Sequence, residues 1–227
     1  MNNQEKRALD MLKNVRDFDA AHDVLFPAGT LARDLFDTIG GVVNDLEGHA
    51  ASEADGRNTA RQGTAGKAVA KAGIMEGLGI LHRTARSMSG VIPGVEERFP
   101  LPHKQDGQEL VITARAALEA AESLKAEFLR REVQERVFQD LAANIAAYEA
   151  ALTGQNTGKD ESVTAAASID AAIERGMDAL HQLDPIVRNK LHNNTALLAA
   201  WLSARRMERA TRRNRTNTPP APQTPNS

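Results

Sequence analysis

One pattern of apolar residues occurs twice in this chain, about a hundred residues apart. Each copy follows the 3.6-residue period of an α-helix, so its members share one helical face. The first set recurs at an offset of 102 residues, as Phe36, Ile39, Val43, Leu46 and Glu47 and then Phe138, Leu141, Ile145, Tyr148 and Glu149. The second set recurs at an offset of 99, as Ile74, Gly77, Leu78, Leu81 and His82 and then Ile173, Gly176, Met177, Leu180 and His181. Either a duplicated helical hairpin or amphipathic helices that share only their period account for the pattern.

The composition favours an all-α fold. The 227 residues include 38 alanines, which have the highest helix propensity, and aromatic residues make up only 4%. Amphipathic helices have to bury their apolar faces against one another. We therefore expect an antiparallel bundle of six or seven helices, a single domain over residues 1–210 with pseudo-repeat halves at about 1–98 and 105–210.

Caps, prolines and glycines set the expected helix boundaries. The expected helices cover about 4–22, 30–51, 64–89, 108–128, 133–152, 162–183 and 195–209, with a short helix that begins at Asp184-Pro185 and ends near 192. The glycine-rich stretch 52–66 predicts a partly helical connection, and 153–161 predicts a turn. Residues 90–107 are the expected central linker, and Trp201 is expected to anchor the last helix to the core.

Charge is distributed unevenly. The net charge is −2, but six arginines and one glutamate from Trp201 onward give that end a charge of +5. The proline-rich, basic tail 211–227 is expected to be disordered. The chain has no cysteine, and it shows neither an N-terminal apolar stretch nor an apolar run of 18 residues. These features predict a cytoplasmic protein without a membrane segment.

A metal site is one chemical possibility. Asp178 precedes His181 by three residues, which places carboxylate and imidazole on one helical face, the spacing found in di-iron bundles. His82 occupies the matching place in the other copy, where Gly79 stands in the position of Asp178. The simpler interpretation is a set of amphipathic histidines at the edge of the core, and we expect no cofactor.

Two basic segments could bind a polyanion. The first contains Arg57, Arg61, Lys67 and Lys71, for which a solvated helix surface is the alternative. The second contains Arg205, Arg206, Arg209, Arg212, Arg213 and Arg215, for which stabilisation of a helix C-terminus is the alternative. No aromatic residues are interleaved with the cations of the first segment, so nucleic acid is not its favoured ligand. For the second segment, RNA, DNA or an acidic protein is the expected kind of partner if it binds one.

Four blocks of the sequence carry a resemblance. In chain order they are ARQGTA (60–65), HRTARSM (82–88), IDAAIERGMDAL (169–180) and IVRNK (186–190). They resemble a group of all-helical bacterial proteins for which no activity is established. The resemblance implies a helical fold and transfers no role to any residue.

The sequence favours a non-enzymatic structural or protein-interaction bundle, with a protein partner or self-association. The alternative is a metal-dependent helical-bundle enzyme that uses His82, His181 and Asp178. Polyanion binding through the two basic segments is the weaker third hypothesis. No motif for a serine nucleophile or for a phosphate-binding loop supports another class of enzyme.

Overall fold

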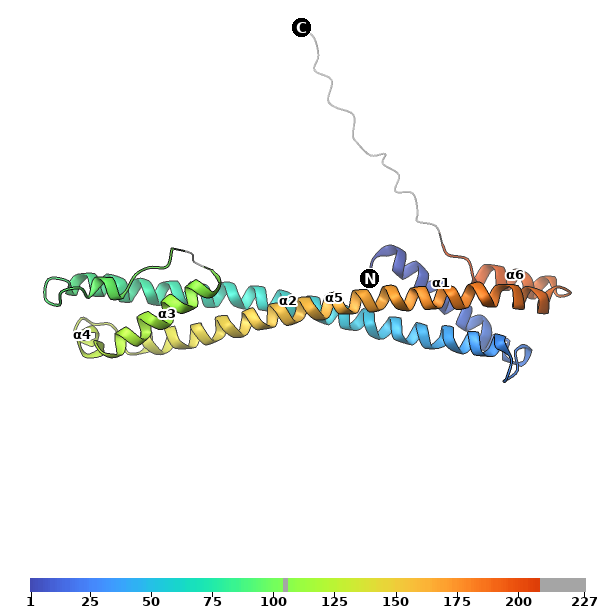
Figure 1. Cartoon of the computed structure of the whole chain (residues 1–227), viewed down its shortest axis with the longest axis horizontal. Helices are drawn as coiled ribbons and strands as arrows, with labels where there is room; N and C mark the ends of the chain where they lie inside the picture. The colour runs from blue at the N-terminus through green and yellow to red at the C-terminus, as the bar shows by residue number, and fades with distance from the viewer. Residues whose placement is uncertain (104–105, 209–227) are drawn as a thin grey trace, which may run out of the picture. The chain divides into compact units, whose positions relative to one another are not determined.

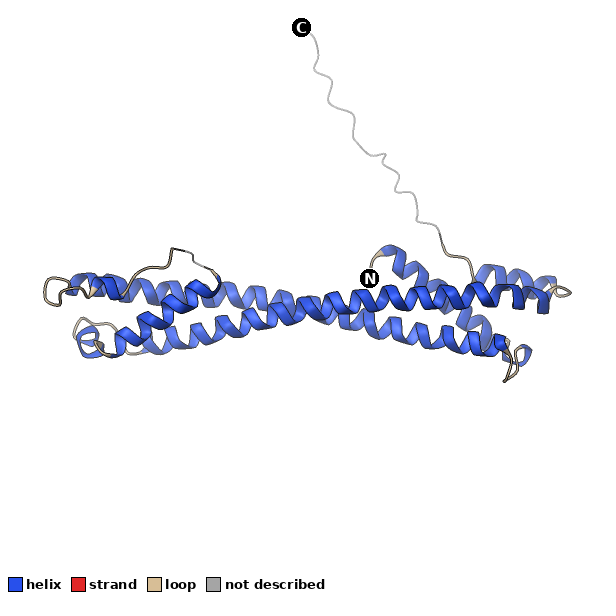
Figure 2. Ribbon diagram, in the orientation of Figure 1, coloured by secondary structure: helices blue, strands red, loops and turns tan. Residues whose placement is uncertain are grey.

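The computed structural model describes residues 1–103 and 106–208, and every regular element within them is helical (Figure 2). Figure 1 labels the α-helices, which are α1 (Asn3–Ala21), α2 (Leu31–Met88), α3 (Gly107–Glu122), α4 (Lys125–Leu129), α5 (Arg136–Leu191) and α6 (Thr195–Ala204). Two short 3-10 helices cover Asp23–Leu25 and Glu96–Arg98. The prediction of an all-α chain is confirmed.

The chain forms two compact units, each built from two stretches of sequence. Unit 1 contains residues 46–171 together with Met1, and unit 2 contains residues 2–45 and the described residues from 172 onward. Both boundaries fall inside the long helices α2 and α5. The halves 1–98 and 105–210 divide the chain differently, by sequence likeness, and they stay a prediction.

Two long helices replace the shorter ones that the sequence predicted. α2 has 58 residues and α5 has 56, so the expected connection at 52–66 and the expected turn at 153–161 are both helical. The new helix start at Asp184-Pro185 is also wrong, because Pro185 lies inside α5. These predictions treated each glycine or proline as a local helix breaker, and packing between helices overrides that local preference.

Three glycines of these stretches, Gly56, Gly63 and Gly158, lie where α2 and α5 approach each other within unit 1. A Cβ atom added to Gly56 would lie 2.8 Å from the backbone oxygen of Gly158. Further along α2, a Cβ atom added to Gly77 would lie 3.2 Å from the side chain of Leu141, a residue that comes earlier in α5. The two helices therefore run antiparallel in unit 1, and the lack of a side chain at Gly56 allows their backbones to approach closely.

The core of unit 1 joins α2, α3, α4, α5 and the loop that follows α2. Ile74 and Leu81 of α2, Leu110 of α3 and Leu141 of α5 are all buried in it. The ring of Phe128 in α4 packs edge-on between Phe99, at 5.3 Å, and Phe138, at 5.9 Å. Within the central linker, Val95 and Phe99 are buried against the helices, whereas Val91 and Leu101 are exposed.

The core of unit 2 surrounds Trp201 of α6. Its indole is fully buried and lies 5.3 Å from the ring of Phe18 in α1 and 6.1 Å from that of Phe36 in α2. Leu12 and Ile39 are also fully buried. The prediction that Trp201 anchors the last helix is therefore confirmed. Asn194 caps that helix, since its side chain accepts a hydrogen bond from the Leu197 amide.

Candidate functional site

Asp184 joins three side chains at the C-terminal end of α5. Its carboxylate accepts a hydrogen bond from the Trp201 indole N–H at 2.9 Å and one from Arg188 Nε at 3.0 Å, and it forms an ion pair with Arg205. Burial raises the pKa of Asp184, but the hydrogen bonds from Arg205, Trp201 and Arg188 outweigh it, and the pKa is lowered. Asp184, expected to cap a helix, instead fixes α6 and Arg205 to α5.

A second polar cluster, in unit 1, fixes the start of α3. The hydroxyl of the buried Tyr148 donates to the carboxylate of Asp106 and accepts a hydrogen bond from the Gly107 amide at 2.8 Å. Lys67 Nζ lies 3.4 Å from the same carboxylate. The hydrogen bond from Tyr148 is the main cause that lowers the pKa of Asp106. This cluster connects α2, α3 and α5, and its role is to hold these helices together.

The proposed metal ligands are not brought together as a set. His82 is half-buried in unit 1, and its Nδ1 lies 2.8 Å from the Phe99 carbonyl oxygen. Because a carbonyl only accepts, this ring nitrogen carries the proton, and the histidine holds the linker against α2. Asp178 and His181 are exposed on α5 in unit 2. Within residues 1–103 and 106–208, no three histidine or carboxylate side chains gather closely enough to hold a metal ion.

The first basic segment is partly neutralised by acids of unit 1. Arg57 forms an ion pair with the buried Glu53 one helical turn earlier, and Lys67 faces Asp106. Arg61 is exposed and Lys71 is half-buried. Two of the four predicted cations therefore have carboxylate partners, which reduces the positive potential that a polyanion would meet.

The second basic segment is described only in its first part. Arg205 pairs with Asp184, whereas Arg206 is exposed. The remaining arginines of the prediction, and the tail 211–227, lie outside the described residues, namely Arg209, Arg212, Arg213 and Arg215.

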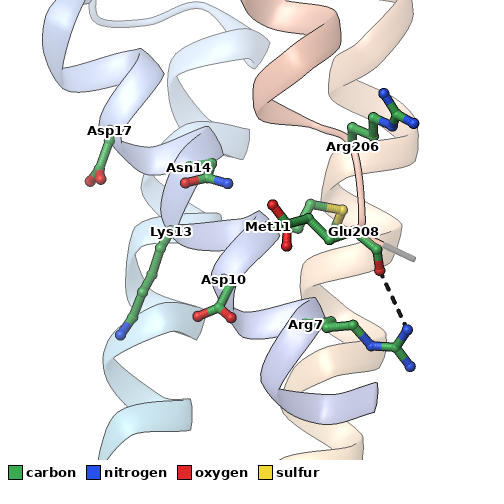
Figure 3. A pocket seen from close by; sticks show the side chains of 8 residues that line it. All are labelled: Arg7, Asp10, Met11, Lys13, Asn14, Asp17, Arg206 and Glu208. Atoms are coloured by element: carbon green, nitrogen blue, oxygen red, sulfur yellow. Dashed lines mark hydrogen bonds between the residues drawn. The ribbon is translucent and has the colours of Figure 1, made fainter. Parts of the chain in front are cut away.

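A polar cleft lies between α1 and the segment that follows α6 in unit 2 (Figure 3). Its volume is about 410 Å³, and its lining residues are Arg7, Asp10, Met11, Lys13, Asn14, Asp17, Arg206 and Glu208. Arg7 donates a hydrogen bond from Nη1 to the backbone oxygen of Glu208 at 3.4 Å, the dashed line in Figure 3. Three cations and three carboxylates thus line one open surface.

The chemistry of this α1 cleft suits contact with a polar surface. Balanced charges of both signs can each find an opposite charge on a protein partner, which gives orientation and specificity. Of the lining residues, only Arg206 has a predicted binding role, as part of the second basic segment. The signal was present, because positions 7, 10, 14 and 17 repeat at helical spacing and are all polar.

No helix within the described part of the chain combines the length and the apolar content needed to cross a bilayer. Comparison with known proteins adds no relative, since no family model, no curated protein and no solved structure matches the chain. The resemblance of the four sequence blocks to all-helical bacterial proteins therefore stays a prediction.

Proposed function

We propose that this chain is a non-enzymatic structural or protein-interaction protein, an antiparallel helical bundle that presents surfaces to a partner. The observation that carries the proposal is that the two long helices, α2 and α5, are occupied by packing contacts with other helices. α2 and α5 lie in backbone-close contact through glycines over part of unit 1, and the half-buried Asp184 and the buried Tyr148 connect helix to helix through hydrogen bonds. These contacts support a structural role, in which the polar side chains available for binding are those on the surface.

The α1 cleft is the surface that best fits a partner. Asp10, Asn14 and Asp17 are exposed along one face of α1, and Arg206 lies opposite them. A protein surface with alternating charges would find counter-charges there without the chain having to rearrange.

Site-specific photo-crosslinking tests the proposal. A photoreactive residue at Asn14, in the cleft, is compared in the native cells with one at Glu174, which is exposed on α5 of the same unit. We expect Asn14 to crosslink to one defined polypeptide and Glu174 to do so at a much lower yield. A product of twice the chain mass would identify self-association.

A charge reversal provides the matched control for the cleft. Asp10→Lys changes an exposed side chain of the cleft and should reduce the Asn14 crosslink several-fold with the fold intact. Crosslinking that is equal at Asn14 and Glu174, or that ignores Asp10→Lys, would contradict the proposal.

The metal-dependent enzyme is the alternative, and it makes a different prediction. It requires a stoichiometric transition metal in the purified protein, held by His82 or by Asp178 and His181. Elemental analysis of the wild type and of His181→Ala separates the two functions, since a metal lost with His181 would favour the enzyme.

A further inference from the structure

α2 and α5 pass through a stretch of unit 1 that has almost no buried apolar side chain. In the described residues of α2, no apolar side chain is buried between Leu46 and Ala70. Along α5, Ala165 is the only one between Tyr148 and Ile169 in the same described part. We call residues 50–68 and 151–168 the coreless segment. Both helices have buried apolar residues on either side of it along the chain.

Glycine-to-backbone contacts replace the missing core. A Cβ atom at Gly63 would lie 2.6 Å from the amide nitrogen of Gln155, and one at Gly158 would lie 2.5 Å from that of Ala60. Side chains are therefore excluded from this contact. Backbone contacts of the Cα–H···O type contribute about 0.5–1 kcal/mol each, against about 1.5–3 kcal/mol for a fully buried leucine side chain.

The polar groups of the segment do little to fasten the two helices. Gln155 donates to the Thr64 hydroxyl at 2.7 Å, but both groups are exposed to water. The carboxylate of the buried Glu53 pairs with Arg57 and with the amino group of Met1, neither of which belongs to α5. An open groove of about 700 Å³ follows the segment, lined by His49, Ser52, Asp55, Thr157, Asp160, Glu161, Thr164, Ala165 and Ser168.

We propose that the coreless segment opens locally, so that α2 and α5 separate over 50–68 and 151–168 while the cluster around Ile74 and Leu141 stays packed. Cooperative units with few buried apolar contacts open at the lowest free energy. The segment is thus a built-in joint, where the helices bend or slide without losing a hydrophobic core. This inference does not rest on the proposed function.

Distance measurements between spin labels test the opening, and the chain has no native cysteine to interfere. One labelled pair, Asn58→Cys with Asn156→Cys, lies in the segment, and the reference pair, Ala72→Cys with Ala147→Cys, lies beside the unit 1 core. All four positions are exposed. We expect one narrow distance distribution for the reference pair and an additional, longer population for the segment pair.

Matched glycine variants then separate the effect of a backbone collision on the longer population from the general effect of adding a methyl group. Gly158→Ala collides with the backbone of α2 and should increase the longer population at least twofold, as well as the amide exchange rate in both stretches. Gly154→Ala, where an added Cβ meets nothing within 4 Å, should not increase it.

A single narrow distribution for both pairs, with amide protection in the segment equal to that of residues 74–88, would overturn the proposal. If Gly158→Ala fails to fold, the two wild-type distance distributions and the wild-type amide exchange rates decide the question without it. Gln155→Ala is then a second control, because it removes only an exposed hydrogen bond and should leave the longer population unchanged. A segment pair with one narrow distribution would count against opening.

Discussion

At the scale of single residues, Asp184 is the side chain for which a nearly isosteric substitution should lower the free energy of unfolding the most. Its side chain is 19% exposed and pairs with Arg205, whose own side chain is 29% exposed. Asp184→Asn keeps an acceptor for Trp201 but removes the charge, and we expect about 2 kcal/mol less free energy of unfolding. Urea unfolding followed by the fluorescence of the sole tryptophan measures the loss.

Asp17→Asn is the matched control for that substitution. Asp17 forms its ion pair with Arg16 on the surface, so its replacement should change stability by only about 0–1 kcal/mol. Equal losses for the two variants would show that the Asp184 cluster adds nothing beyond an ordinary surface ion pair.

Asp106 predicts a pH dependence of stability. The hydrogen bond from Tyr148 and the N–H of Gly107 lower its pKa below the ordinary value of 3.8, so the folded state favours the carboxylate. The stabilisation is therefore full above the unfolded pKa and is lost as the pH falls through the lower, folded pKa. We expect the stability difference between wild type and Asp106→Asn to be present at pH 7 and to shrink at about pH 3.

Urea midpoints of both proteins at the two pH values provide that measurement. Tyr148→Phe, which removes the donating hydroxyl, should reduce the same difference at pH 7. A difference that is constant with pH would show that the charge of Asp106 is irrelevant to folding.

At the scale of helices, Pro185 is the exposed residue least compatible with its surroundings. It lies inside α5, where it cannot donate the hydrogen bond that the His181 carbonyl would accept. An internal proline costs about 3 kcal/mol relative to alanine, so we expect Pro185→Ala to raise the free energy of unfolding by about 1–3 kcal/mol. Thermal and urea unfolding give the value.

Pro93→Ala is the comparison, since Pro93 is exposed in the loop after α2 and should change stability by less than about 1 kcal/mol. A destabilised Pro185→Ala protein would be equally informative. It would show that the proline geometry is needed to bring Asp184 to the Trp201 indole.

The same helices show what the sequence could and could not predict. The apolar period correctly predicted the buried faces, as Phe36, Ile39, Leu141 and Ile145 show. The positions of the breaks could not be predicted, because a glycine such as Gly158 has the same local preference in a turn and at a close helix contact. Whether such a glycine lies in a turn or at a helix contact depends on the helix that packs against it, and one sequence does not show which helix that is.

The candidate site was less predictable than the fold. The two basic segments are predicted without carboxylate partners, whereas Arg57, Lys67 and Arg205 pair with Glu53, Asp106 and Asp184. Lys67 and Asp106 are 39 positions apart in the chain, so helical periodicity carries no information about their pairing. The polar face of α1, in contrast, could have been predicted from helical periodicity.

At the scale of the whole molecule, each unit contains one natural optical probe. Trp201, the sole tryptophan, is buried in unit 2, and Tyr148, the sole tyrosine, is buried in unit 1. α2 and α5 have almost no buried apolar side chains in the coreless segment. A loss of packing in one unit should therefore have little effect on the stability of the other. The two probes should therefore report two unfolding transitions that respond separately to mutation.

Phe128→Ala and Leu12→Ala test this separation. Phe128 is fully buried in unit 1, and its truncation should cost about 3–5 kcal/mol in the tyrosine transition and leave the tryptophan transition unchanged. Leu12, fully buried in unit 2, should have the converse effect at about 2–5 kcal/mol. Val163→Ala, at a side chain that is 69% exposed, should shift neither. If Phe128→Ala moved both transitions equally, the long helices would be transmitting stability through the glycine contacts, and the coreless segment would be as cooperative as the packed clusters.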